Sequence, residues 1–251
     1  GSFQDWDLDK WSHLVFSYDG QTLCMYHNGV LKATKEISGS VNSSESKMRI
    51  GTGNYINDSN LFFMGKMSDL RIYNHALSSD QIKALYSGGA DTLTTSQPAA
   101  SSGTTTTGTT PATGSTGSPA DSGLVAQYKL NGDCNDASGN GNNGSVVGDV
   151  SFVDDPVMGK CAVFNGGYIN VPSSPDLNLG DNFAISVWNK VDPIMAADGN
   201  KEGSIISKLD DAGNYNVYYV YTRGTFGAHM YGIFTSGEHS IVPGPFQDWD
   251  L

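Results

Sequence analysis

The sequence predicts an all-β protein in which two antiparallel sheets pack face to face as a sandwich. Short segments rich in β-branched and aromatic residues recur along the chain, separated by Gly, Asn and Ser clusters. The 31 glycines and a charged fraction of 16% suit short strands joined by tight turns. The apolar runs are too short and too regularly broken for strand–helix–strand units, which argues against a parallel α/β sheet.

Four strand-like segments precede residue 90, and they read WSHLVFSYDG, QTLCMYHNGVLKATKEI, KMRIGTG and FFMGKMSDLRIYNHAL. Within the second segment, Asn28 and Gly29 separate two apolar runs. Such a pair favours a two-residue hairpin loop, because Asn and Gly tolerate the positive φ values that the loop requires. The sequence therefore predicts a β-hairpin with its tip at these two residues.

A short helix is predicted near residues 78–86, directly after the fourth segment. Ser78 or Ser79 can cap its first turn, and a glycine pair follows its last turn. Helical spacing places three residues on one face of this helix: Ile82, Leu85 and Tyr86.

The stretch from residue 90 to 122 is predicted to be a linker. It consists almost wholly of Thr, Ser, Gly, Ala and Pro, with one leucine and no aromatic residue. Such a segment cannot offset the entropy of ordering by burying apolar surface. Thr/Pro-rich stretches of this kind are often O-glycosylated stalks.

Strand-like segments resume after the linker as GLVAQYKLNG, KCAVFNGGYINVP, FAISVWNKVD, GSIISKLDD and NYNVYYVYTR. In the last of them, period-two alternation places Tyr215, Tyr219 and Tyr221 on one face and Tyr218 on the other. Together with Asn214, the first three form a surface on which sugar rings could stack. The alternative is that these tyrosines fill the sandwich or cover a sheet face.

The hexapeptide FQDWDL occurs twice, at residues 3–8 and at residues 246–251. Chance recurrence of such a string is negligible, so the two ends mark the same place in one repeating sequence. Joining the second copy to the first gives one composite order: YKLNGDCNDASGNGNNG, AVFNGGYINVP, FAISVWNKV, IISK, WSHLVFSYDG, MYHNG, RIG and GKMSDLRIYNHALSSDQIKALY.

In this order the segments resemble the laminin-G-like, concanavalin A-like jelly-roll family of secreted bacterial proteins. The resemblance implies that residues 1–89 are the C-terminal half of one jelly roll, that residues 90–122 are the linker, and that residues 123–251 are the N-terminal half. The swapped order is explained either by one repeat of a tandem array or by an engineered circular permutation. The halves could close within one chain, or the second half of one chain could complete the first half of the next.

The resemblance implies a non-catalytic extracellular module that binds a glycan or another cell-surface ligand in adhesion. The alternative function is a structural repeat that polymerises into an extracellular filament by exchange of half-domains. The net charge of −12 argues against nucleic acid, and no apolar run approaches the roughly 20 residues that span a bilayer. Paired carboxylates and a G-x-S-x-G motif are both missing, so an enzyme is not expected.

Calcium is the one cofactor that the sequence leaves open. The stretch DCNDASGNGNNG offers Asp133, Asp136 and Asn140 as oxygen ligands for a structural ion. It lacks the spacing of an EF-hand loop, and the alternative is a cluster of Asn and Gly chosen for turns with positive φ.

The pentraxins, distant relatives on this fold, imply a second place for calcium. Asn60 and Asn214 fall where pentraxins have amide residues, whereas Gly53 and Tyr55 stand where they have two acidic ligands. Two nearby carboxylates have no counterpart in the pattern: Asp58 and Asp210. The missing acids argue against a two-calcium site and leave a single cation open.

The three cysteines are too few for a disulfide scaffold. Cys134 and Cys161 bracket a stretch rich in Gly and Asn, and a disulfide between them is predicted. The alternative is two buried thiols. Cys24 is expected to be a small core residue of a strand.

Overall fold

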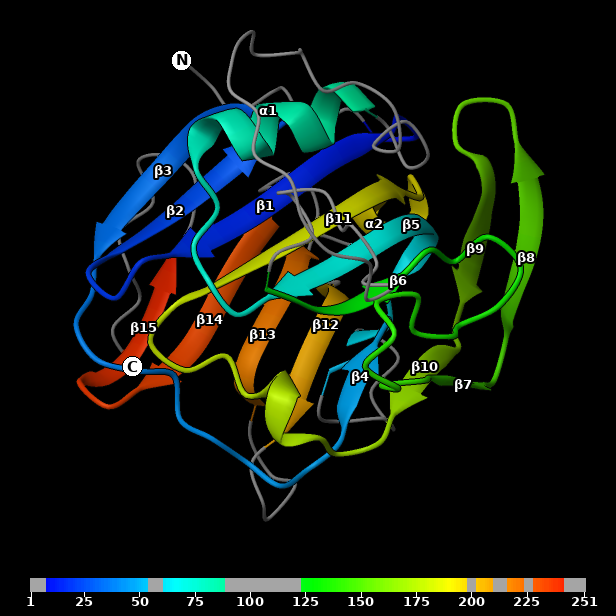
Figure 1. The fold of residues 1–251 in the computed structure, drawn as a ribbon. Coiled ribbons are helices and arrows are strands. Elements are labelled where there is room, and N and C mark those ends of the chain that lie inside the picture. Colours follow the sequence, from blue (N-terminus) through cyan, green and yellow to red (C-terminus); the bar gives the residue numbers. More distant parts are fainter. Residues whose placement is uncertain are drawn as a thin grey trace, which may run out of the picture.

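The computed structural model describes residues 8–53, 61–88, 123–197, 202–209, 216–223 and 228–241. They form two antiparallel β-sheets packed against each other, with one ten-residue helix on the outside (Figure 1). The predicted all-β sandwich with a short helix is confirmed. Below, "the first portion" means residues 8–88 and "the second portion" means residues 123–241.

Eight strands form the first sheet, in the order β3-β2-β1-β11-β5-β9-β8, and β6 pairs with β5 beside this path. Their bounds are β1 Ser12–Tyr18, β2 Thr22–His27, β3 Val30–Glu36, β5 Met64–Tyr73, β6 Leu124–Tyr128, β8 Val150–Asp155, β9 Gly159–Asn165 and β11 Phe183–Val191. In β2, buried and partly exposed side chains alternate, as expected of a strand with one face on the core. In β1 every side chain is buried, because the core covers one face and the helix packs on the other.

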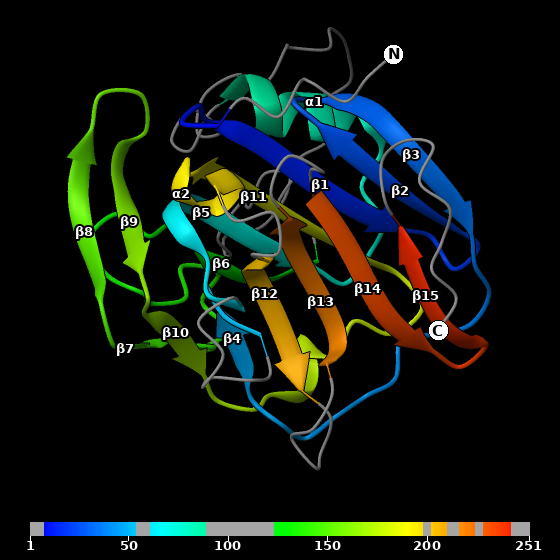
Figure 2. The same cartoon turned by 180° about the vertical axis from the view of Figure 1, so that it is seen from behind.

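Seven strands form the second sheet, in the order β15-β14-β13-β12-β4-β10-β7. Their bounds are β4 Met48–Ile50, β7 Ser145–Val147, β10 Tyr168–Val171, β12 Glu202–Leu209, β13 Asn216–Arg223, β14 Ala228–Phe234 and β15 Gly237–Ile241. Figure 2 shows β12 to β15 side by side in this sheet. Two short helical segments lie in connections: η3 Pro175–Leu177 and α2 Ile194–Ala197.

Strands of the two portions interleave in both sheets. In the first sheet, β11 from the second portion lies between β1 and β5 from the first portion. In the second sheet, β4 from the first portion lies between β12 and β10 from the second. The two portions therefore share both sheets.

The main hydrophobic core lies between the sheets and also draws on both portions. At its centre, Ile50 of β4 stands opposite Ile169 of β10 on one side and Ile206 of β12 on the other. All three side chains are fully buried. On the first sheet, Leu14 stands opposite Val187, and both belong to the same core.

Helix α1, Ser79–Gly88, covers the outer face of the first sheet (Figure 1). Its buried residues Ile82 and Leu85 pack with Val15 of β1, Ala184 of β11 and other residues in a second, smaller apolar cluster. Ser78 begins the helix: its Oγ accepts a hydrogen bond from the N–H of Gln81 at 3.3 Å, and the Gln81 side chain accepts one from the N–H of Ser78 at 2.9 Å. This reciprocal pair is a capping box.

Replacing Ser78 with Ala is expected to lower the free energy of unfolding by about 1 kcal/mol, because the first turn loses its N-cap. Chemical denaturation measures the change. Ser79→Ala is the matched control, since Ser79 is also exposed but has no part in the capping hydrogen bonds. Equal losses in the two variants would contradict the assignment of the cap.

The hairpin predicted from Asn28 and Gly29 is present. β2 ends at His27, β3 begins at Val30, and the two loop residues have φ values of 51° and 74°. The Asn28 side chain also accepts a hydrogen bond from the N–H of His13 at 2.8 Å, which fastens the tip of the hairpin to β1.

The predicted disulfide between Cys134 and Cys161 is wrong, because all three cysteines are free thiols. Cys161 is buried in β9 of the first sheet. Cys134 lies in the loop after β6, where its carbonyl accepts a hydrogen bond from the N–H of Gly144, next to the second sheet. Burial raises the pKa of both thiols.

Candidate functional site

The outer face of the second sheet carries a row of aromatic side chains. Strand β13 turns Tyr218 and Val220 into the core, where neither is exposed. Its alternation places Tyr219 and Tyr221 on the opposite face, as the sequence pattern predicts. Strand β14 adds His229, which stands opposite Tyr221 in the sheet.

The rings of this row are stacked on one another. The centroids of Tyr219 and Tyr221 lie 4.6 Å apart with 18° between the ring planes, and those of Tyr221 and His229 lie 4.9 Å apart at 15°. Two near-parallel rings this close cannot share one face of Tyr221, so its ring is sandwiched between its neighbours. A ligand would meet the edge and hydroxyl of Tyr221 rather than its ring face. We call these three residues the aromatic row.

The segment after β4 supports one end of the row. A Cβ placed on Gly53 would lie 3.5 Å from the ring of Tyr219, so this backbone passes close to the tyrosine. Arg49 donates a hydrogen bond from Nη1 to the carbonyl of Gly53 at 2.9 Å. Ser207 of β12 donates its hydroxyl proton to the carbonyl of Thr52 at 2.8 Å. These two bonds hold the backbone of residues 52 and 53 beside Tyr219. Tyr219 is only 7% exposed.

The guanidinium of Arg49 also contacts an aromatic ring. Its Cζ lies 5.7 Å from the ring centroid of Tyr168 on β10, within the range of a cation–π contact. Burial lowers the pKa of Arg49, and the nearby Tyr168 acts in the opposite direction. Arg49 is 6% exposed, so its role is to hold the backbone behind Tyr219 and not to contact a ligand directly.

Several predicted site residues lie outside the described residues. They are the ligand-binding candidates Asn214 and Tyr215 and the cation candidates Asp58, Asn60 and Asp210. Of the four predicted ligand-binding residues, the structure describes Tyr219 and Tyr221 and brings them into contact.

Sequence reasoning missed His229. Its segment, AHMYGIF, does alternate between buried and partly exposed residues, as a strand with one covered face does. The alternation was the available signal, but the stacking partner of His229 lies on another strand. Only the register of β13 with β14 places it opposite Tyr221.

The loop predicted as a calcium site is closed by hydrogen bonds to Asp136. Oδ1 of Asp136 accepts hydrogen bonds from the N–H groups of Gln127 and Ser138, each at 2.9 Å. Oδ2 accepts one from the N–H of Asn142 at 3.0 Å. Asp136 is 9% exposed, and both of its oxygens face backbone donors.

The other two members of this predicted calcium site also have protein partners. Asp133 accepts two hydrogen bonds from Asn135, and Asn140 donates its side-chain N–H groups to the carbonyls of Leu124 and Val125. Among the described residues, no three His, Cys, Asp or Glu side chains are grouped so that they could hold a metal ion. These hydrogen bonds are those of a cluster of turns, and an ion at the loop would compete with the N–H donors for the carboxylates. Calcium at this loop stays a prediction.

A serine–histidine pair lies under helix α1 on the outer face of the first sheet. Nε2 of His13 and Oγ of Ser186 share a hydrogen bond of 2.8 Å. The ring of Tyr86 stacks on the imidazole, and the ring of Trp188 packs against it at a tilt of 34°. Both His13 and Ser186 are at most 2% exposed. Desolvation, together with the nearby Arg71, lowers the pKa of His13 to about 3.

This pair lacks the arrangement of a catalytic triad. In a triad, an acidic residue orients the histidine by accepting a hydrogen bond from Nδ1. Nδ1 of His13 has no hydrogen-bond partner among the described residues, and the serine hydroxyl has no access to a substrate. His13 therefore serves as a buried residue of the packing under α1.

Comparison with known proteins agrees with the architecture. Residues 2–83 match a laminin-G family model described as the concanavalin A-like lectin/glucanases superfamily. No curated protein matches the chain, and no solved structure does. Within the described ranges, no helix has the length and apolar character needed to cross a membrane.

Proposed function

We propose that this laminin-G-like jelly-roll domain is a non-catalytic binding module whose ligand docks on the aromatic row. One observation carries the proposal: Tyr219, Tyr221 and His229 form a continuous stack on the outer face of a sheet, and among the described residues they do not belong to the main core between the sheets. The family match supports a binding fold of this kind. Rigid aromatic side chains also give contact area at a small entropic cost.

The ligand that this surface favours is a neutral carbohydrate. Tyr221 is partly exposed, so its hydroxyl can hydrogen-bond to a sugar hydroxyl while the apolar edges of the ring pack on C–H groups. The hydroxyl of Tyr219 and Nε2 of His229 are buried and support the row from within. The net charge of −12 disfavours an anionic ligand. An extracellular, adhesive setting fits such a ligand and remains part of the proposal.

The absence of catalysis is also proposed, on the roles of the buried carboxylates. The three buried aspartates of the described residues are Asp69, Asp136 and Asp155. Each of them accepts at least three hydrogen bonds from N–H groups of the protein. Carboxylates held in this way stabilise loops and strands and are poorly placed for acid–base chemistry.

Replacing Tyr221 with Ala is expected to weaken glycan binding about tenfold or more, because the middle ring of the stack is lost. A glycan array first identifies the sugar, and calorimetry then measures the dissociation constants in calcium and in EDTA. Tyr221→Phe separates the hydroxyl from the ring: it should lose only the hydrogen bond of the phenol. Equal affinity with and without calcium is expected of the aromatic row alone, whereas loss in EDTA would place a cation beside it.

The matched control is Tyr86→Ala, which removes a partly exposed tyrosine from the other sheet's outer face. It should leave glycan affinity unchanged. The proposal fails if no glycan binds in either buffer, or if Tyr86→Ala weakens binding as much as Tyr221→Ala does.

A further inference from the structure

Four strands pair only with strands of the portion to which they do not belong: β4 and β5 of the first portion, and β6 and β11 of the second. β11 of the second portion pairs with β1 and β5, which belong to the first. β5 pairs with β11, β6 and β9, and β4 pairs with β12 and β10, all from the second portion. If the portions were separated, each of these strands would lose every strand partner that the structure gives it.

Separation would also open the core. The inner face of β11 carries Phe183, Ile185 and Val187, each at most 1% exposed when the portions are joined. Their neighbours across the sheet are Tyr18, Phe16 and Leu14, in that order. A portion on its own would therefore expose unpaired strand edges and a large apolar surface, and both features favour association with a complementary chain.

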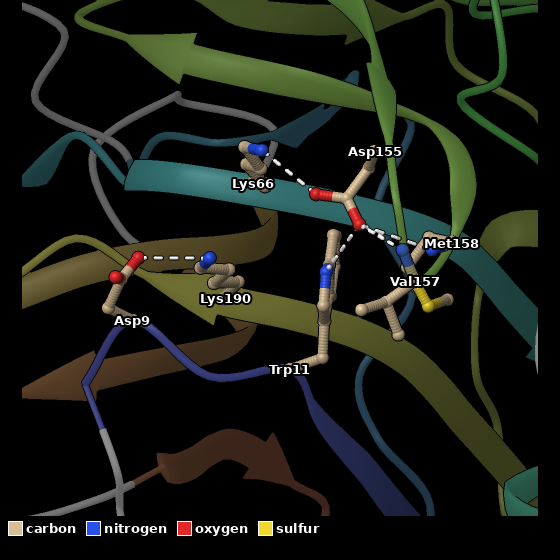
Figure 3. A network of polar contacts seen from close by, with 7 residues as sticks. All are labelled: Asp9, Trp11, Lys66, Asp155, Val157, Met158 and Lys190. Carbon is tan, nitrogen blue, oxygen red and sulfur yellow. Dashed lines mark hydrogen bonds and ion pairs between the residues drawn. The ribbon is translucent and has the colours of Figure 1, made fainter.

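Polar contacts between the portions fix the register in which they join. Figure 3 shows Trp11 and Lys66 of the first portion reaching the carboxylate of Asp155 at the end of β8. The indole N–H of Trp11 donates to Oδ1 at 3.0 Å, and Nζ of Lys66 donates to Oδ2 at 2.9 Å. Nearby, Lys190 of β11 forms an ion pair with Asp9 at 3.0 Å (Figure 3).

We call the contacts of Asp155 with Trp11 and Lys66 the clasp. The environment of Asp155 favours these contacts. Burial alone would raise its pKa, but the hydrogen bonds from Lys66, Trp11 and the N–H groups of Val157 and Met158 outweigh burial and hold the pKa below its usual range. The carboxylate is thus charged at neutral pH and depends on donors from the other portion. A slipped register would leave this buried charge without two of its donors, at a high cost.

We propose that a second copy of this chain is a binding partner: the second portion of one molecule completes the first portion of another, through the same strand pairs and the same clasp. Nothing in these contacts depends on which molecule supplies the second portion, because the two portions are joined only through residues 89–122. A connection of this length keeps the portions of one chain at an effective concentration on the order of millimolar. Closure within one chain therefore dominates in dilute solution, and exchange appears when chains fold together at high concentration.

The test uses two variants of the whole chain, each with a buried apolar residue replaced by Asp in a different portion. Leu70→Asp places a charge in β5 of the first portion, and Ile185→Asp places one in β11 of the second; both positions are at most 1% exposed. Neither variant should regain near-ultraviolet circular dichroism alone. Refolded together, they should form a dimer in which one unit has two undamaged portions, with up to half of the wild-type signal. If the mixture stays unfolded where wild type refolds, the proposal is overturned.

A second measurement does not depend on the variants being unfolded. Wild-type chain is mixed with an isotope-labelled copy, unfolded, refolded at protein concentrations up to about one millimolar, and analysed by native mass spectrometry. Dimers of mixed mass are expected, in a fraction that rises with concentration. Monomers alone at every concentration would overturn the proposal, and this outcome would leave the glycan-binding proposal untouched.

Discussion

Replacing Asp69 with Asn is expected to lower the free energy of unfolding by about 3–5 kcal/mol, because it leaves a buried guanidinium without its counter-charge. Nε of Arg71 donates to both carboxylate oxygens of Asp69, at 2.9 and 3.0 Å, and Nη2 lies 2.9 Å from Oδ2. Gln127 of β6 donates a further hydrogen bond to Oδ1 at 2.7 Å. The side chains of Asp69 and Arg71 are only 4–5% exposed, so water cannot solvate the guanidinium once the carboxylate is lost.

Asn is the suitable replacement because the backbone at this position has a φ of 48°. Asn tolerates this left-handed conformation, whereas Ala would add backbone strain to the loss of charge. The double variant Asp69→Asn with Arg71→Met removes both charges and should be more stable than Asp69→Asn alone. Urea unfolding measures all three proteins. A loss below about 1 kcal/mol in Asp69→Asn would show that the pair is solvated.

The parts of the fold that were predicted correctly depend on neighbours in the sequence. The Asn28–Gly29 loop needs only residues with access to positive φ, and these are recognised locally. Helix α1 likewise begins at a capping serine and buries residues at helical spacing. Period-two alternation along β13 is also a local pattern, and it correctly predicts that Tyr218 lies on the opposite face from Tyr219 and Tyr221.

The parts that failed depend on distances between segments far apart in the chain. The disulfide prediction rests on Cys134 and Cys161 bracketing a loop, but in the folded chain both thiols are free. A carboxylate in an Asn/Gly loop suits either a cation or backbone donors; the structure shows the backbone donors of Asp136, and the ion stays a prediction. The stack with His229 required the register of β14, which no local pattern contains.

Stability is expected to fall as the pH falls from about 6.5 towards 3, and His13 is the residue responsible. An ordinary histidine in the unfolded chain takes up a proton near pH 6.5. In the folded protein, desolvation under α1, with Arg71 and His27 nearby, lowers the pKa of His13 to about 3. Between these values the unfolded state binds more protons than the folded state. The free energy of unfolding should therefore decrease by about 1 kcal/mol for each unit of pH lost.

Two variants assign this slope to His13. Ser186→Ala removes the hydrogen-bond partner of Nε2 but keeps the buried imidazole, so the slope should persist. His13→Phe combined with Ser186→Ala replaces both polar partners by apolar groups, and the curve between about pH 6.5 and 4.5 should become flatter. Asp155 does not interfere in this range, because its depressed pKa affects stability only below the ordinary pKa of an aspartate, about 4. Parallel curves for wild type and the double variant would mean that His13 takes up its proton in the folded state, and that the space beneath α1 admits water.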